Sequence, residues 1–238
     1  MQRNPVPQPA VQPRVLRMEV ALVLLLTFAP GLLGLLILAM GQDNTSAPDK
    51  LVPAMVSGAF DLFLSWSPVL LIGYLLVRSA EGRAGIGLGR FQLAGDGLVG
   101  LGLWVASFVL VLVLSGLLSP FGERQVDFLP TALPLWFRIV DALVIATTAG
   151  VTEEIVVRGY AQTRLEQLGA SAAVIILLPT GLWGLLHLYE GPGAALTIFC
   201  LGVMYAVYYH RTRRLWPLII AHGLFDLTQL ALLLVAHH

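Results

Sequence analysis

Polar side chains that can move protons stand in three short motifs within otherwise apolar sequence. The motifs are Glu153-Glu154-x-x-x-Arg158, Trp183-x-x-x-His187 and His222-x-x-x-Asp226. Ionisable side chains at membrane depth are costly, so they are rare there and indicate function. Carboxylates beside imidazoles can take a proton from water and deliver it to a leaving group. We therefore predict a water-activating site built from these residues.

The first motif gives two adjacent carboxylates different surroundings. On an α-helix, Glu154 and Arg158 are four residues apart, share one face and stand in the favourable acid-first order. Arg158 can therefore hold Glu154 ionised through a bidentate contact. Glu153 is rotated by about 100° and is free to face a cavity. Taken alone, this motif also fits a local salt-bridge cluster near a membrane surface.

The two histidines strengthen the catalytic interpretation of the carboxylates. A single histidine in an apolar helix is more often a hydrogen-bonded structural residue than a base. Asp226 follows His222 by four residues, so it shares that helical face and can orient the imidazole. In a helical hairpin that turns near Gly169, Glu153 and His187 lie at nearly the same depth. That arrangement requires residues 158–169 to protrude into the cytosol.

Composition places these motifs in a membrane. Hydrophobic residues make up 57% of the 238-residue chain and charged residues only 12%, which is about half of the charged share in soluble domains. Several apolar runs reach the length of about 20 residues that a spanning helix needs. No basic cluster indicates a nucleic-acid partner. The single cysteine, Cys200, excludes an intramolecular disulfide and a cysteine-rich zinc site.

The predicted fold class is all-α, a polytopic membrane helical bundle of about seven transmembrane helices. The predicted spans are residues 19–40, 51–77, 97–118, 135–157, 170–188, 193–210 and 215–236. Residues 1–17 are expected to form a disordered basic tail, 18–133 supporting helices, and 134–232 the catalytic domain.

The distribution of basic residues predicts the orientation of the chain. An N-terminus in the cytoplasm places eleven arginines on the inner segments and only Lys50 and Arg124 on the outer ones. We therefore predict a multi-pass membrane protein with a cytoplasmic N-terminus, in the plasma membrane if the chain is prokaryotic.

Further charged residues within the predicted spans include Arg138, Asp141 and Asp61. Arg138 and Asp141 are three residues apart, which predicts a local ion pair. Asp61 has no local partner and fits either a polar group in a cavity or an interhelical hydrogen bond.

At its three motifs the chain resembles the CAAX protease and bacteriocin-processing (CPBP) family of intramembrane endopeptidases. This family includes type II CAAX prenyl endopeptidases and many bacterial Abi membrane proteins. Its members carry Glu-Glu-x-x-x-Arg, then an aromatic-x-x-x-His, then His-x-x-x-Asn or Asp, on three different helices. Here the first motif is intact and the third has the aspartate form, while Trp183 stands where the family usually has phenylalanine. The resemblance covers residues 134–232.

The resemblance implies an intramembrane endopeptidase similar to CAAX prenyl protease 2, with its site in a cavity open to the cytosol. Glu153 with His187 would act as general base on the attacking water. His222 and Asp226 would polarise the developing oxyanion, with Asp226 either protonated or orienting His222. The residues in supporting positions would be Glu154, Arg158 and Trp183.

The resemblance leaves the metal requirement open, because family members have been described both as metalloproteases and as glutamate-type enzymes. Glu153, His187 and His222 could form a three-ligand zinc site with an open position. The chain lacks a His-Glu-x-x-His motif, which favours a mechanism without metal. We therefore expect no cofactor, with Zn²⁺ as the alternative.

The expected partners are the lipid bilayer and a peptide or protein substrate. Membrane-associated and lipidated proteins are among the substrates that this prediction includes. Two other function classes compete with the protease. A proton-coupled transporter would also use intramembrane acids and histidines, but no inverted repeat is present. A non-catalytic membrane scaffold would not need every motif position to be filled.

Overall fold

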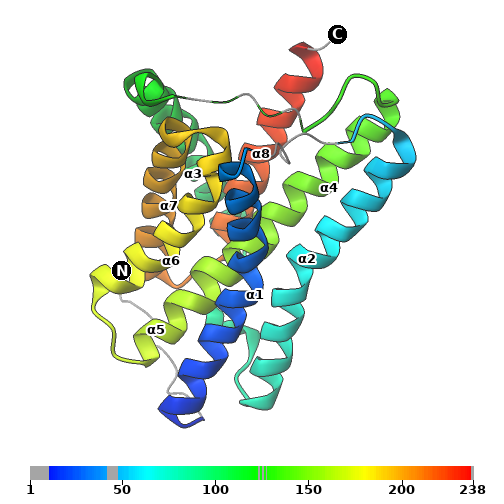
Figure 1. The fold of residues 1–238 in the computed structure, drawn as a ribbon. Coiled ribbons are helices and arrows are strands. Elements are labelled where there is room, and N and C mark those ends of the chain that lie inside the picture. The colour runs from blue at the N-terminus through cyan, green and yellow to red at the C-terminus, as the bar shows by residue number, and fades with distance from the viewer. Residues whose placement is uncertain (1–10, 42–47, 123, 125, 127, 237–238) are drawn as a thin grey trace.

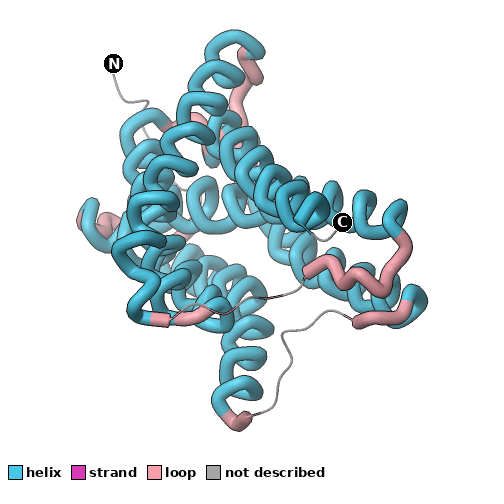
Figure 2. The backbone as a smooth tube through the Cα atoms, turned by 90° about the horizontal axis from the view of Figure 1, so that it is seen from above, coloured by secondary structure: helices cyan, strands magenta, loops and turns pink. Residues whose placement is uncertain are grey.

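The structure of the protein is a computed structural model that describes all residues except 1–10, 42–47, 123, 125, 127 and 237–238. The described residues contain helices and loops but no strand (Figure 1, Figure 2). The α-helices are α1 (Pro13–Ala39), α2 (Leu51–Arg78), α3 (Leu93–Leu118), α4 (Leu135–Glu153), α5 (Thr163–Gln167), α6 (Ala172–Leu186), α7 (Pro192–Thr212) and α8 (Trp216–Ala236). The prediction of an all-α helical bundle is confirmed.

Shorter helical segments connect these elements. A π-helix, η3 (Glu154–Gln162), joins α4 to α5 without a break. The 3-10 segments are η1 (Arg83–Ile86), η2 (Ser119–Phe121) and η4 (His187–Glu190). Each of the seven predicted spans falls on one of the resulting rods, in which α4, η3 and α5 count as one.

Among the described residues, six helices are long and apolar enough to cross a membrane, which indicates a multi-pass membrane protein. They are Pro13–Ala39, Leu51–Arg78, Leu93–Leu118, Ala172–Glu190, Pro192–Thr212 and Trp216–Val235. The predicted span 135–157 is helical but is not one of the six, and its helix carries Arg138, Asp141 and Glu153.

The rods pack in a closed ring around η3. Neighbouring pairs along the ring are α1–α2, α2–α4, α4–α8, α8–α3, α3–α7, α7–α6 and α6–α1. The segment η3 contacts α1, α2, α6 and α7, and all nine of its residues are buried. Because a π-helix is rare and often marks a functional site, its position at the centre of this bundle directs attention to Glu154 and Arg158.

The predicted disordered tail ends earlier than expected, and the segment after the first motif is largely buried. The helix α1 begins at Pro13, a residue suited to a first helical turn, so residues 13–17 are helical rather than disordered; residues 1–10 of the predicted tail lie outside the described residues. Within residues 158–169, which were predicted to protrude into the cytosol, Arg158, Gln162 and Arg164 are each at most 1% exposed. Arg164 is accommodated inside by an ion pair with Glu81 at 2.8 Å.

A close helix crossing brings the first and third motifs together. At Gly150 on α4, a Cβ atom would lie 2.7 Å from the backbone nitrogen of Gly223 on α8. Small residues permit such backbone approach between membrane helices. Gly223 directly follows His222, and Gly150 lies one turn before Glu153 and Glu154. The spacing between α4 and α8 therefore sets the distance between these motifs.

We expect Gly150→Ala to destabilise the protein, because the added methyl group meets backbone atoms that cannot move independently of α8. Overpacking of this kind costs about 1–3 kcal/mol, and the midpoint of thermal unfolding should fall by about 3 °C or more. Thermal unfolding of purified protein in detergent measures this change.

Gly102→Ala provides the matched control, since Gly102 lies on α3 and its Cβ would meet nothing within 4 Å. This control should unfold at the wild-type temperature or slightly above it. Equal midpoints for the two variants would show that the α4–α8 crossing tolerates a wider spacing.

Candidate active site

A hydrogen bond between α4 and α6 joins the first two motifs. Glu153, the last residue of α4, accepts a hydrogen bond at Oε2 from the indole N–H of Trp183. Trp183 and His187 lie one turn apart, with ring centroids 5.0 Å from each other. Glu153, Trp183 and His187 all line the same cavity. The predicted proximity of Glu153 and His187 is therefore present in the fold.

The hydrogen bond of His187 defines which ring nitrogen is available as a base. Its Nδ1 lies 3.0 Å from the carbonyl oxygen of Trp183, and a carbonyl oxygen can only accept. Nδ1 must therefore carry the hydrogen, so that in the neutral ring Nε2 keeps the lone pair. The His187 imidazole is thus held in the tautomer that can take a proton at Nε2.

Glu154 links the first motif to the third from a fully buried position. Its Oε1 accepts hydrogen bonds from Arg158 Nη1 at 2.9 Å and from His222 Nδ1 at 2.8 Å. The predicted Glu154–Arg158 pair is present but is not bidentate, because Arg158 Nη2 instead lies 3.4 Å from the Gly202 carbonyl. One carboxylate oxygen therefore connects η3 with α8.

The guanidinium of Arg158 also extends the contact to α6. Its central carbon lies 4.5 Å from the centroid of the Trp183 ring, within the range of a cation–π interaction. The tryptophan that donates to Glu153 is therefore packed against the arginine that neutralises Glu154.

His222 lies between the carboxylates of all three acids. Its Nε2 is 3.5 Å from Asp226 Oδ2 and 3.9 Å from Glu153 Oε2, while Nδ1 bonds Glu154. The predicted contact between His222 and Asp226 across one helical turn is present. Because α4, η3, α6 and α8 each contribute a side chain, the three sequence motifs form one cluster.

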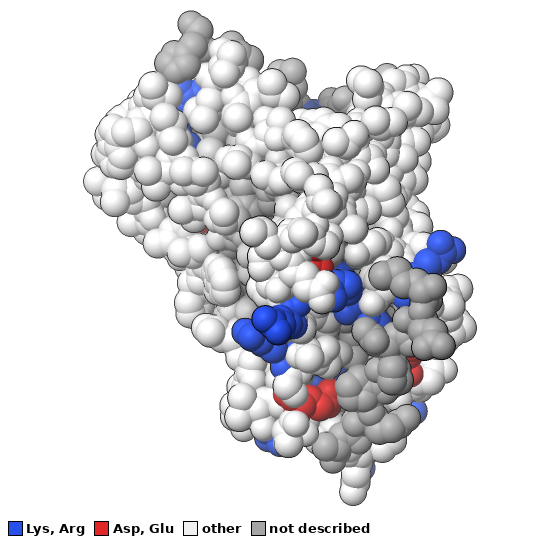
Figure 3. All heavy atoms as spheres, turned by 180° about the vertical axis from the view of Figure 1, so that it is seen from behind, with Lys and Arg blue, Asp and Glu red and all other residues white. Residues whose placement is uncertain are grey.

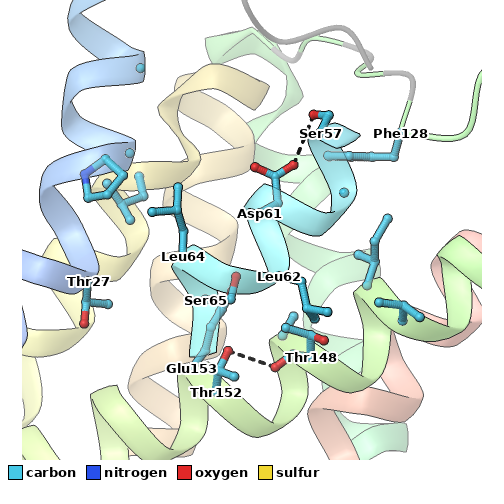
Figure 4. Close-up of a pocket in the computed structure, with 18 of the residues that line it drawn as sticks. Thr27, Ser57, Asp61, Leu62, Leu64, Ser65, Phe128, Thr148, Thr152 and Glu153 are labelled. Atoms are coloured by element: carbon cyan, nitrogen blue, oxygen red, sulfur yellow. Dashed lines mark hydrogen bonds between the residues drawn. The ribbon is translucent and has the colours of Figure 1, made fainter. Parts of the chain in front are cut away.

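A cavity of about 700 Å³ leads away from this cluster between α1, α2, α4 and α6. Figure 4 shows Glu153 and Thr152 at one end of the cavity and Asp61, Ser57 and Phe128 at the other. Of the two roles predicted for Asp61, the structure shows the polar group in a cavity: its side chain lines the wall and accepts a hydrogen bond from Ser57 Oγ at 3.5 Å.

The cavity occupies the half of the bundle away from most arginines. It is lined by the second half of α1, the first half of α2, and by Pro48 and Phe128 in the connections at that end. Arg78, by contrast, ends α2 at the opposite side, and Figure 3 shows most charged atoms of that face in its lower half. The cavity and the arginine-rich end of the bundle therefore lie in opposite halves of the molecule.

Sequence reasoning missed several polar groups near the cluster. Asp141 lines the cavity, while Arg138 donates from Nε to the Leu129 carbonyl at 3.1 Å in place of the predicted pair with Asp141. Tyr189 and Glu190 follow His187 by two and three residues in η4, and this closeness in sequence was the available signal. Nothing in the sequence indicated that Asp141 lines a cavity, because its three-residue spacing from Arg138 predicted an ion pair between the two side chains.

The described residues do not form a metal site as they are placed. Among them, no group of three His, Cys, Asp or Glu side chains could hold a metal ion. For the zinc alternative, His222 is the clearest mismatch, because Nδ1 is engaged by Glu154 and Nε2 faces two carboxylates.

Comparison with known proteins gives one match. Residues 134–228 match the family described as type II CAAX prenyl endopeptidase Rce1-like. No curated protein matches the chain, and no solved structure does. The matched residues include every member of the cluster, from Glu153 to Asp226. The part of the chain that carries the cluster therefore matches an Rce1-like family, which is consistent with the resemblance to the CPBP family.

Proposed function

We propose that the protein is an intramembrane endopeptidase, similar to CAAX prenyl protease 2, that cleaves a peptide bond with a water activated by Glu153 and His187. The observation that carries this proposal is the cluster of Glu153, His187 and His222 around Trp183 at the end of a cavity. Membership of residues 134–228 in the Rce1-like family supports the reaction class.

The two neighbouring glutamates would divide the work. The Glu153 side chain is 33% exposed and the Glu154 side chain 0%, so water and substrate can reach only the first. Glu153 would take a proton from water as the water oxygen bonds to the scissile carbonyl carbon. It would then return that proton to the amine as the carbon–nitrogen bond breaks, and Nε2 of His187 offers the second basic position.

His222 and Asp226 would stabilise the oxygen of the tetrahedral intermediate. With Nδ1–H donated to Glu154, Nε2 of His222 faces the Asp226 and Glu153 carboxylates. A proton shared between Nε2 and Asp226 would supply the hydrogen-bond donor that a developing oxyanion needs. Glu154 and Arg158 would act by holding His222 in this position.

The proposed mechanism requires no metal, and its substrate is a peptide or protein segment inside the bilayer. The polar groups of the cluster are engaged with one another in a way that leaves no three-ligand set among the described residues. The cavity walls are formed mainly by apolar helix residues, which suits a membrane-associated or lipidated substrate.

We expect Glu153→Gln to lower kcat for peptide cleavage by at least about 100-fold, because an amide cannot accept the proton from water. The substitution keeps the size of the side chain and an oxygen for the Trp183 donor, so the unfolding temperature should stay near that of wild type. Cleavage of a fluorogenic peptide library by purified protein, with and without a chelator, measures both the activity and its metal requirement.

Asp49→Asn is the matched control, since this exposed acid lies outside the cluster and should leave cleavage unchanged. Chelator-resistant cleavage that disappears in Glu153→Gln supports the proposal as stated. Chelator-sensitive cleavage contradicts the metal-free mechanism. An equally active Glu153→Gln variant removes Glu153 from the reaction.

The supporting role of Arg158 predicts a loss of stability rather than of chemistry alone. Arg158→Met leaves the buried Glu154 carboxylate without its cation, which should cost about 3–5 kcal/mol of unfolding free energy. Adding Glu154→Gln removes the uncompensated charge and should recover most of this loss. Thermal unfolding of the single and double variants in detergent measures this recovery. Equal instability of the two variants would show that an uncompensated charge on Glu154 is not the cause of the loss.

The orientation with a cytoplasmic basic end makes the cavity face the outer side. In a Cys200→Ser background, an impermeant maleimide on intact cells should label Asp49→Cys and should leave Arg90→Cys unlabelled until the membrane is permeabilised. Both positions are exposed and lie at opposite ends of the bundle. The reverse labelling pattern would place the arginines outside and the cavity on the cytosolic side.

A further inference from the structure

Two chain connections meet at the arginine-rich end of the bundle. The helices α2 and α3 are both long and apolar enough to span a membrane, and so are α7 and α8. Irregular backbone does not face lipid within the hydrocarbon layer, so the residues between Arg78 and Leu93 lie where the chain leaves it. The connection from Thr212 to Trp216 is shorter and lies at the same boundary.

Hydrogen bonds join these two connections. The amide of Leu215 donates to the Gly87 carbonyl at 3.1 Å. The indole N–H of Trp216 donates to the Gly89 carbonyl at 2.8 Å. Residues 83–91, which we call the 83–91 loop, are therefore held against the start of α8, at the level where that helix enters the membrane.

The middle of the 83–91 loop is also fixed from inside the bundle. Ile86 is 1% exposed and belongs to the main hydrophobic core. Gly87 has φ of 85°, and a Cβ there would lie 2.7 Å from the ring of Tyr209, so this close approach requires glycine. The loop is thus a rigid surface, and a partner that binds it would not have to order it first.

This surface carries positive charge without a matching acid. Arg83 and Arg90 of the loop and Arg211 at the end of α7 are exposed, and none of the three forms an ion pair with another described residue. The described acids of this end are paired with other arginines: Glu19 with Arg78, Glu81 with Arg164, Asp96 with Arg214, and Glu166 with Arg213.

Asp96, the acid nearest to Arg90 in the sequence, has both oxygens occupied. Its side chain is 1% exposed, Oδ1 accepts from Arg214 Nε at 2.7 Å, and Oδ2 accepts from Arg214 Nη2 at 2.6 Å. The amide of Gln92 donates to Oδ2 as well, at 2.7 Å. The charge on Arg90 is therefore left to a partner outside the described chain.

Apolar side chains stand beside these arginines. Phe91 is 44% exposed and Leu93 78%, and the Phe91 ring packs edge to face on Trp216 with centroids 5.5 Å apart. Aromatic rings of this kind are enriched at the level of lipid headgroups. Guanidinium groups bind phosphate oxygens through two parallel hydrogen bonds. Cationic and apolar groups at one level match the phosphate and the first acyl carbons of a phospholipid.

We propose that the 83–91 loop and the end of α7 form a docking surface for anionic phospholipids, with Arg83, Arg90 and Arg211 as the contacts for the headgroup phosphate. Phe91 and Leu93 contact the adjoining acyl chains. This inference goes beyond the proposed function and does not depend on it, because the surface is separate from the cluster of Glu153, and its test measures no cleavage.

Lipid binding by paired variants tests the proposal. Native mass spectrometry of the purified full-length protein, titrated with phosphatidylglycerol or phosphatidylcholine in a neutral detergent, gives the apparent Kd of each lipid. Wild type should prefer phosphatidylglycerol. An arginine near an anionic surface contributes about fivefold in affinity, so Arg83→Gln with Arg90→Gln should weaken phosphatidylglycerol binding by about 20-fold. Adding Arg211→Gln should weaken it about fivefold further.

Arg14→Gln with Arg17→Gln is the matched control, because these two arginines are also exposed at this end but lie on α1. This control loses the same charge and should keep most of the affinity for phosphatidylglycerol. An equal loss in both double variants overturns the proposal, since the attraction then belongs to the whole basic end. Absence of a lipid preference in wild type overturns it as well.

Thermal unfolding in the same detergent distinguishes a lipid from a soluble phosphate. Phosphatidylglycerol should raise the unfolding midpoint of wild type, because a ligand that binds only the folded protein stabilises it. Phosphatidylcholine and glycerol 3-phosphate at the same concentration should not. The variant with Arg83→Gln and Arg90→Gln should unfold at the wild-type midpoint without lipid and gain nothing from phosphatidylglycerol. Equal protection by glycerol 3-phosphate would assign the surface to a small soluble anion and overturn the lipid proposal.

Discussion

The rest of the site depends on the buried carboxylate of Glu154. The Glu154 side chain is 0% exposed. Burying a carboxylate costs desolvation free energy unless an opposite charge and hydrogen bonds compensate it. Arg158 and His222 both reach the same oxygen, at 2.9 and 2.8 Å. The bond from His222 holds η3 against α8, and the Arg158 guanidinium, which packs on the Trp183 ring, holds η3 against α6. The Gly150–Gly223 crossing is what allows α8 to come close enough for the second bond.

The π-helix explains how so many polar side chains share the centre of an apolar bundle. All residues of η3 are buried, so it has no face for the lipid and each side chain must meet a neighbour. Gly159 permits part of this enclosure, because a Cβ there would lie 3.0 Å from the Ile86 carbonyl. The neighbours of η3 come from α1, α2, α6 and α7. The first half of the chain therefore encloses the site as well as supporting the bundle.

The sequence predicted the helices and the members of the cluster because those depend on local composition and spacing. Glu154 with Arg158, and His222 with Asp226, are four residues apart, so helical geometry alone brings each pair together. The course of residues 158–169 was not predictable in this way, because the burial of Arg164 depends on Glu81, which is 83 residues distant. The cavity wall at Asp61 and Asp141 likewise results from the packing of α2 on α4. Hydropathy does not specify which helices become neighbours.

The junction between α4 and η3 lies between Glu153 and Glu154 and gives these adjacent carboxylates different surroundings. Glu153 closes α4 and turns its carboxylate toward Trp183 and the cavity, while Glu154 opens η3 and turns inward to Arg158 and His222. Only the first can exchange protons with water, and only the second has a fixed cation on the same segment. His222 contacts Glu154 through Nδ1 and faces Glu153 and Asp226 through Nε2. The position of the buried Glu154 carboxylate therefore fixes the imidazole that lies beside the accessible Glu153 carboxylate. The placement of the accessible carboxylate thus depends on a charge pair that is itself fully buried.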